Sequence, residues 1–360
     1  MINYMDSFFN QYHTEDTLIK GIDSVLNSYK NLKVYSFPTY IDPLYLRKLK
    51  IGSDYFRLIS ENDGIFLFEL LLSERKSEPK NGEGINKVFI VESKLHENIY
   101  TVILLGRSRL HLSKILAYFN KAYPKVSLSF ITHKKLENLL VHFRDKEGFD
   151  LNIIRATSHS RIGKKIMTSI SWTELSIERA FEWVANENGW FQNLTFRVNK
   201  SSMPTAEISI SRNGIIRSNR YFKLIFSDFI LPISNVTYEN IKFFSKRARL
   251  EDPDRNVHPL VINLGEDQFI NPEENHKFID IMKTMKATSL SVIHGNPYIH
   301  ISLFDYYDGS SFDVWVLSAD KIIIVPQLKA SFQAIKRLIN YVFDNYAEGD
   351  VKEYEVEFNE

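Results

Sequence analysis

The segment from Lys87 to His133 constrains the fold of this 360-residue chain more than any other. Apolar runs of strand length lie on either side of a turn at 96–98, and a basic amphipathic helix pattern and a third strand pattern follow. The first of these strands is expected to carry Glu92-Ser93-Lys94. Because side chains two residues apart on a strand point to the same side, Glu92 and Lys94 are predicted to share one face of a sheet.

The pattern on either side of this segment predicts an N-terminal α/β domain. Helix and strand patterns alternate over 1–198, which favours a mixed sheet with flanking helices. The next seven residues, NKSSMPT at 199–205, are small, polar or proline, and such a stretch is typical of a linker between domains. We therefore place the domain boundary there.

Residues 206–360 predict an α+β domain. Asn213-Gly214 lies between alternating residues and is a strong signal for a β-hairpin. Four closely spaced strand patterns between 289 and 326 indicate an antiparallel meander, and the amphipathic pattern at 331–346 predicts a terminal helix that closes it.

Composition narrows the chemistry that this chain can perform. It contains no cysteine, which excludes disulfides, thiolate zinc sites, iron–sulfur clusters and thiol nucleophiles. Lys and Arg number 45 against 44 Asp and Glu, so any attraction to a polyanion must come from local clustering of charge. Neither a signal-peptide pattern nor a run of ~20 apolar residues is present. We therefore expect a soluble, cytoplasmic protein with no membrane partner.

The Glu-x-Lys tripeptide is the first candidate site. Upstream acids at Asp63 or Glu69, followed by Glu92 and Lys94 on the next strand, form an order that resembles the metal-dependent nuclease core of many restriction and repair enzymes. The resemblance implies that Glu92 and Asp63 hold Mg²⁺ through carboxylate oxygens while Lys94 stabilises the developing phosphate charge. The alternative interpretation is an ion pair exposed to solvent on an edge strand.

Clusters of basic residues form the second candidate site. Aromatic residues lie beside several of them, and basic groups next to stacking surfaces suit a protein that binds a phosphate backbone. The alternative is a set of ordinary solvated charges. The clusters are Arg107, Arg109, His111 and Lys114; Arg155, His159, Arg161, Lys164 and Lys165; Arg212, Arg217 and Arg220; and Lys242, Lys246, Arg247 and Arg249.

A third candidate lies in the C-terminal half, where histidines and acids recur along the expected meander. His300 and Asp305 have opposite parity on their strand, so they are not expected to converge on one metal. The Asp308-Gly309 pair is accounted for by turn chemistry. The sequence also lacks the usual motifs of P-loop, dinucleotide-binding, nucleophile-elbow and zinc-protease enzymes.

These observations favour a component that binds nucleic acid or another polyanion. Lys, Asn, Ile, Tyr and Phe usage is typical of an AT-rich bacterial source, and an accessory protein of an anti-phage defence system, with other protein subunits as partners, would fit. Two alternatives stay open: a metal-dependent nuclease that uses Glu92 and Lys94, and a non-catalytic protein-interaction subunit.

Overall fold

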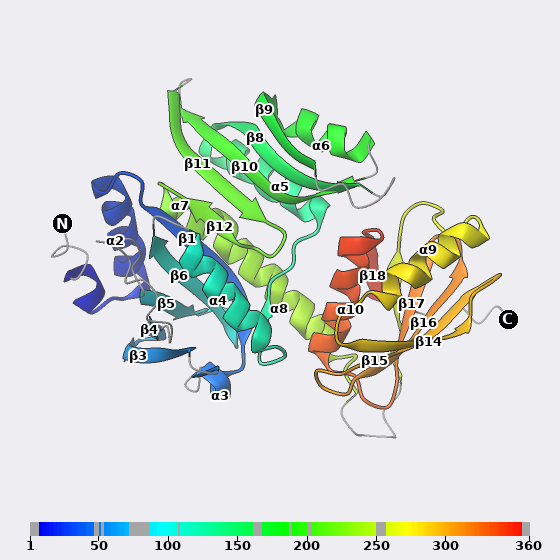
Figure 1. Cartoon of the computed structure of the whole chain (residues 1–360). Helices are drawn as coiled ribbons and strands as arrows, with labels where there is room; N and C mark the ends of the chain where they lie inside the picture. Colours follow the sequence, from blue (N-terminus) through cyan, green and yellow to red (C-terminus); the bar gives the residue numbers. More distant parts are fainter. Residues whose placement is uncertain are drawn as a thin grey trace. The chain divides into compact units, whose positions relative to one another are not determined.

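The computed structural model of the chain consists of two compact units, Met1–Tyr238 and Glu239–Glu360 (Figure 1). The boundary lies inside helix α8 (Leu231–Ser245). The structure describes residues 7–46, 50–51, 54–71, 87–106, 109–160, 168–186, 189–200, 203–249 and 257–354.

The linker predicted at 199–205 lies within a sheet of unit 1. Strands β10 (Gly189–Lys200) and β11 (Met203–Ser211) pair antiparallel, with Val198 opposite Ala206 and Lys200 opposite Met203. The prediction of a linker was wrong because small, polar and proline residues are also typical of the turn of a hairpin. The structure therefore assigns both sides of this stretch to one unit.

Unit 1 is built on a single sheet of strand order β2-β3-β4-β5-β6-β1-β12-β11-β10-β8-β9, with β7 also paired to β1. Every pairing among its described strands is antiparallel, and the predicted α/β fold with a sheet flanked by helices is confirmed. The remaining strands are β1 (Lys33–Ile41), β2 (Lys50–Ile51), β3 (Asp54–Asn62), β4 (Ile65–Leu71), β5 (Lys87–Glu92), β6 (Ile99–Gly106), β7 (Val126–Leu128), β8 (Asp150–Ser160), β9 (Thr168–Ser176) and β12 (Ile216–Ser218).

Helices pack against both faces of this sheet. One face, which we call face A, contributes to a core shared with α2 (Glu15–Ser28), α5 (His133–Glu147), α6 (Ile177–Asn186), α7 (Phe222–Ile225) and the π-helical turn η1 (Phe226–Ile230). The opposite face, face B, forms a second core with α4 (Leu110–Lys121) and the short α3 (Pro43–Leu46). That second core draws on strands β1 and β3 to β7.

A single row of side chains crosses face B. Its first half is mostly apolar and its second half is polar. Each residue is the register partner of the next, and in strand order the row is Leu58, Phe68, Val88, Leu104, Tyr35, Arg217, Ser209, Thr195 and Arg155. Four of the first five belong to the core under α4. The last four are polar, so the part of face B on β12, β11, β10 and β8 is a hydrophilic surface.

The Asn213-Gly214 hairpin predicted from sequence is confirmed. Gly214 has a φ of 69°, and its N–H donates to the carbonyl oxygen of Ser211 at 2.9 Å. Because a positive φ favours glycine, this residue allows the tight return between β11 and β12. The hairpin places Arg217 on β12 beside Ser209 on β11.

His133, at the start of α5, is packed among the aromatic rings of Phe181 and Phe191 and accepts the Phe191 N–H through Nδ1 at 3.2 Å. Burial, with the charge of Arg212 in addition, lowers the pKa of His133 to about 4. The folded state therefore holds a neutral imidazole at pH values where the unfolded chain is protonated.

This histidine is expected to make unit 1 sensitive to acid. Between pH 6.5 and about 4 the unfolded chain binds one more proton than the folded chain, so stability falls as the pH is lowered through this window, by about 3 kcal/mol from this group. Urea unfolding across pH 4 to 7 should show a shallower decline for His133→Gln than for the wild type. His142, exposed on the same helix, offers the control, and a His142→Gln profile as shallow as that of His133→Gln would contradict the assignment.

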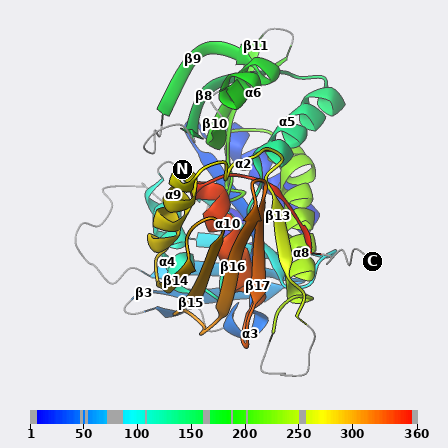
Figure 2. The same cartoon turned by 90° about the vertical axis from the view of Figure 1, so that its right-hand side faces the viewer.

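Unit 2 contains the predicted antiparallel meander. Strands β14 (Thr288–His294), β15 (Ile299–Asp305), β16 (Ser311–Ser318) and β17 (Lys321–Pro326) pair in chain order, and β13 (Leu260–Asn263) and β18 (Asp350–Glu353) complete a six-stranded sheet. Figure 2 shows these strands side by side, with α10 (Phe332–Asn345) behind them. The terminal helix is confirmed, with Ser331 as its N-cap, and α9 (Pro272–Lys283) is the other complete helix in the described part of the unit.

Candidate functional site

The polar half of face B is centred on Arg217. Arg217 is the register partner of Tyr35 on β1 and of Ser209 on β11, and its side chain is 15% exposed. Nη2 of Arg217 donates to the hydroxyl of Ser209 at 2.9 Å and to Oε1 of Glu207 at 2.9 Å. The Ser209 hydroxyl in turn contacts that of Thr195 at 2.8 Å. The Ser209 hydroxyl and the Glu207 carboxylate therefore hold the guanidinium in place at the sheet surface, and the Thr195 hydroxyl contacts that of Ser209.

Two further cations, Arg109 and Arg155, act on Arg217 through space. Burial lowers the pKa of the Arg217 guanidinium, and the charges of Arg109 and Arg155 act in the same direction. Burial also lowers the pKa of Lys33, with Arg217 and Arg109 adding to the effect. Lys33 lies on β1 two residues before Tyr35 and thus on the same face. We call Lys33, Arg109, Arg155 and Arg217 the cationic cluster.

The cationic cluster is only partly neutralised by its surroundings. Among the described carboxylates, Glu207 is the one that offsets the repulsion at Arg217 and at Lys33. Arg109 and Arg155 are exposed, whereas Arg217 is largely buried between them. Like charges that are partly removed from water gain most from an added anion, because a bound anion relieves both the repulsion and the lost hydration. The arrangement is suited to binding phosphate or another oxyanion.

The structure places the basic residues that were predicted to bind nucleic acid in different parts of the chain. Arg109 and Arg217 belong to the cationic cluster, and so does Arg155 from the second basic stretch. Lys114 is exposed on α4, while Lys246 and Arg249 belong to unit 2. Arg107, Arg161, Lys164 and Lys165 lie outside the described residues.

Arg212 and Arg247 are not surface cations, contrary to the prediction. Arg212 is 1% exposed and lies over the ring of Phe130 at 4.5 Å. Arg247 is 7% exposed, pairs with Glu353 at 2.8 Å and lies over the ring of Phe243 at 3.7 Å. Both side chains serve packing because aromatic faces and a carboxylate replace water around their charges.

Two of the acids proposed for a nuclease site, Glu69 and Glu92, lie on opposite faces of the sheet. Glu69 is the register partner of Lys87 on β5 and pairs with Arg57 on β3. Glu92 is five residues beyond Lys87, which places it on the other face and roughly 16 Å along the strand. Shared coordination of one metal by Glu69 and Glu92 is therefore excluded by register.

The other two members of that predicted site also depart from the expectation. Strand β5 ends at Glu92, so Lys94 lies in the following bend rather than on the same strand. Asp63 has a φ of 46° and forms a tight turn with Gly64, whose carbonyl oxygen accepts the Glu92 N–H at 2.8 Å. The described residues contain no group of three or more His, Asp or Glu side chains placed to hold a metal ion. Glu69 and Lys94 therefore depart from the arrangement that the resemblance implies, whereas the Asp63-Gly64 turn lies beside Glu92, and Mg²⁺ binding by Asp63 and Glu92 stays a prediction from sequence.

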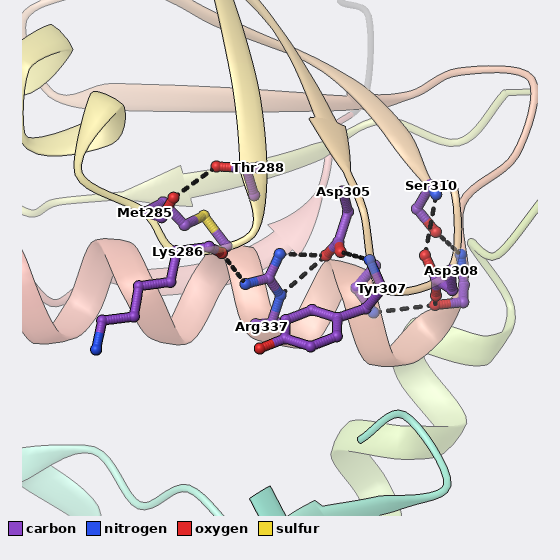
Figure 3. A network of polar contacts seen from close by, with 10 residues as sticks. Met285, Lys286, Thr288, Asp305, Tyr307, Asp308, Ser310 and Arg337 are labelled. Atoms are coloured by element: carbon purple, nitrogen blue, oxygen red, sulfur yellow. Dashed lines mark hydrogen bonds and ion pairs between the residues drawn. The ribbon is translucent and has the colours of Figure 1, made fainter. Parts of the chain in front are cut away.

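The C-terminal acids and histidines separate into two structural groups. His300 stacks on Trp315 with ring centroids 3.7 Å apart, and its Nε2 lies 3.6 Å from Asp313. Asp305 instead pairs with Arg337 on α10 (Figure 3). These contacts confirm that the set does not converge on one centre.

Some residues of the cationic cluster and its surroundings were not singled out by sequence patterns. Lys33, Ser209, Thr195 and Glu207 come from three strands, β1, β11 and β10, and each alone is an ordinary polar residue of a strand. Alternation along β10 and β11 would have placed their polar residues on one face. Their convergence depends on strand order, which alternation does not reveal.

Comparison with known proteins yields no match, either among protein-family models or among curated proteins. None of the helices in the described part of the chain is long and apolar enough to cross a membrane. The function of the cationic cluster is therefore argued from its geometry and charge.

Proposed function

We propose that unit 1 binds nucleic acid through its backbone phosphates at the cationic cluster. The observation that carries this proposal is the row on face B in which Arg217, Ser209, Thr195 and Arg155 are successive register partners. Arg109 and Lys33 interact electrostatically with Arg217, and Glu207 is the acid that offsets the charge at Arg217 and Lys33. Arginine donors match the oxygens of a phosphate, and serine and threonine hydroxyls are common phosphate partners. A regularly charged backbone offers the cluster several such oxygens at once.

Binding is expected to depend strongly on salt and on the exposed arginines. Removing one cation that neutralises a phosphate should lower the slope of log K against log salt by about 0.9 on duplex DNA and weaken binding irrespective of base sequence. Arg155→Ala and Arg109→Ala are the informative variants, because both side chains are exposed and their removal leaves the core intact. Fluorescence anisotropy with a labelled DNA duplex, and with one of its strands alone, measures both quantities.

Arg179 provides the matched control. It is an exposed arginine on α6, which packs on face A, so Arg179→Ala removes the same charge from the opposite side of the sheet. Equal losses for Arg155→Ala and Arg179→Ala would show a general charge effect and would contradict a site on face B. Binding that does not respond to salt would contradict the proposal altogether.

The nuclease alternative is not proposed, because register separates Glu69 from Glu92 and Lys94 lies beyond the strand. A cytoplasmic location, a role in anti-phage defence and association with other protein subunits stay predictions from sequence. Co-purification with a partner, combined with no affinity for either nucleic-acid probe, would favour the protein-interaction alternative.

A further inference from the structure

Glu207 occupies a position between two arginines of neighbouring strands. On one side it accepts a hydrogen bond from Arg217 of β12 at 2.9 Å, and on the other its register partner is Arg197 of β10. Its own N–H donates to the side-chain oxygen of Asn219 at 3.1 Å, which fixes the backbone at this point. The carboxylate can therefore reach a cation in either direction without a change in the sheet.

The two partners of Arg217 differ in exposure. The hydroxyl of Ser209 belongs to a residue that is 8% exposed, whereas the side chain of Glu207 is 46% exposed. An oxyanion arriving from solvent meets Glu207 before Ser209, because the carboxylate is the more exposed of the two acceptors. Carboxylate and phosphate oxygens both accept hydrogen bonds from guanidinium groups in the same geometry, so they compete for the same donor.

We propose that Glu207 is a built-in competitor that sets the affinity and selectivity of the cationic cluster. This inference rests on the proposed function. In the free protein Glu207 occupies the place on Arg217 that a backbone phosphate takes in the complex. On binding, the carboxylate leaves Arg217 and turns toward Arg197. The Ser209 hydroxyl, which Thr195 contacts, continues to accept from the guanidinium while the phosphate takes the vacated acceptor position.

Because Glu207 competes for Arg217, an anion binds the cationic cluster only if its other contacts outweigh the loss of the Glu207–Arg217 pair. A single weak anion must displace a carboxylate that is already in place, which leaves little net gain. A polyanion engages Arg109, Arg155 and Lys33 at the same time, and those additional contacts offset the loss of the Glu207 pair. The cluster should therefore discriminate between polymeric phosphate and inorganic phosphate more sharply when Glu207 is present.

Glu207→Gln tests the proposal directly. Glutamine keeps the size of the side chain and removes the competing charge, so the variant should bind a labelled DNA duplex roughly three- to tenfold more tightly than the wild type. Inorganic phosphate should also compete with the duplex at lower concentration in the variant. Glu182→Gln is the matched control, because Glu182 is exposed on α6 and its replacement changes the net charge equally.

The outcomes separate this inference from the proposed function. Tighter binding by Glu207→Gln, with Glu182→Gln unchanged, supports it. If the wild type binds the duplex and Glu207→Gln changes that affinity by less than twofold, the competitor role is overturned while the nucleic-acid site stands. Equal gains in both variants would also overturn it, since that result reports net charge alone. Absence of binding by wild type and variant together would overturn both proposals.

Arg197→Gln provides a second measurement. If Arg197 receives the displaced carboxylate, its loss should weaken duplex binding in the wild-type background and have a smaller effect in the Glu207→Gln background. Equal effects in the two backgrounds would show that Arg197 acts independently of Glu207 and would remove the second position from the proposal.

Discussion

Replacing Arg337 by leucine is expected to lower the free energy of unfolding of unit 2 by about 3–5 kcal/mol. Arg337 lies on α10, and its Nε donates to Oδ2 of Asp305 at 2.9 Å while Nη1 donates to the carbonyl oxygen of Lys286 at 2.8 Å. Its guanidinium also lies 4.9 Å from the ring of Tyr307 (Figure 3). Asp305 is 1% exposed, so removal of the arginine leaves a buried carboxylate without its cation.

The loss of unfolding free energy can be measured within unit 2 by pulse-labelled hydrogen exchange during urea unfolding, followed in peptides from 299–345. Lys283→Met is the matched control, because it breaks the exposed Lys283–Asp280 pair on α9 and should cost less than about 1 kcal/mol. Asp305→Asn combined with Arg337→Leu should recover part of the loss, since the neutral amide still accepts the Tyr307 N–H. A cost for Arg337→Leu no greater than that of Lys283→Met would contradict a structural role for the buried pair.

Replacing Lys336 by methionine is expected to stabilise unit 2 at pH 7. Lys336 on α10 is 3% exposed, and burial lowers the pKa of its ammonium to about 7. Between about pH 7 and 10.5 the unfolded chain holds a proton that the folded chain has released. Stability therefore rises with pH through this window, by up to about 5 kcal/mol from this group, and the full penalty is present below pH 7.

The pH dependence distinguishes this effect from a simple gain in packing. Methionine keeps the unbranched side chain and cannot titrate, so the stability advantage of Lys336→Met over the wild type should shrink steadily as the pH rises from 7 to 10. Urea unfolding at several pH values measures it. Lys321→Met, at an exposed position on β17, should leave the slope unchanged. A constant difference between Lys336→Met and wild type at all pH values would refute the assignment.

Local chemistry determined much of the fold in advance. Ser331 caps the terminal helix where sequence periodicity placed its first turn, and Gly214 forms the hairpin that Asn213-Gly214 indicated. The meander of unit 2 followed from four short alternating runs separated by turn residues. These features are predictable because each depends on contacts within about ten residues.

The choice of partner strands was decided by tertiary structure. The stretch 199–205 has the composition of a linker, yet β10 and β11 pair on either side of it within a larger sheet. Glu69 and Glu92 lie on strands that are adjacent in the chain, but their register places them on opposite faces. Register and strand order depend on which distant residues pack together, and no local pattern specifies them.

For the candidate site, too, some features were determined by sequence and others only by tertiary structure. Sequence alone determined that this chain carries alternating strands, capped helices, no thiol chemistry and clusters of basic residues. Only the tertiary structure decided that Arg109, Arg155 and Arg217 lie near Lys33, whereas Arg212 and Arg247 are buried against aromatic rings. The physical reason is that charge and periodicity are properties of neighbours in the chain, whereas burial and electrostatic coupling are properties of neighbours in space.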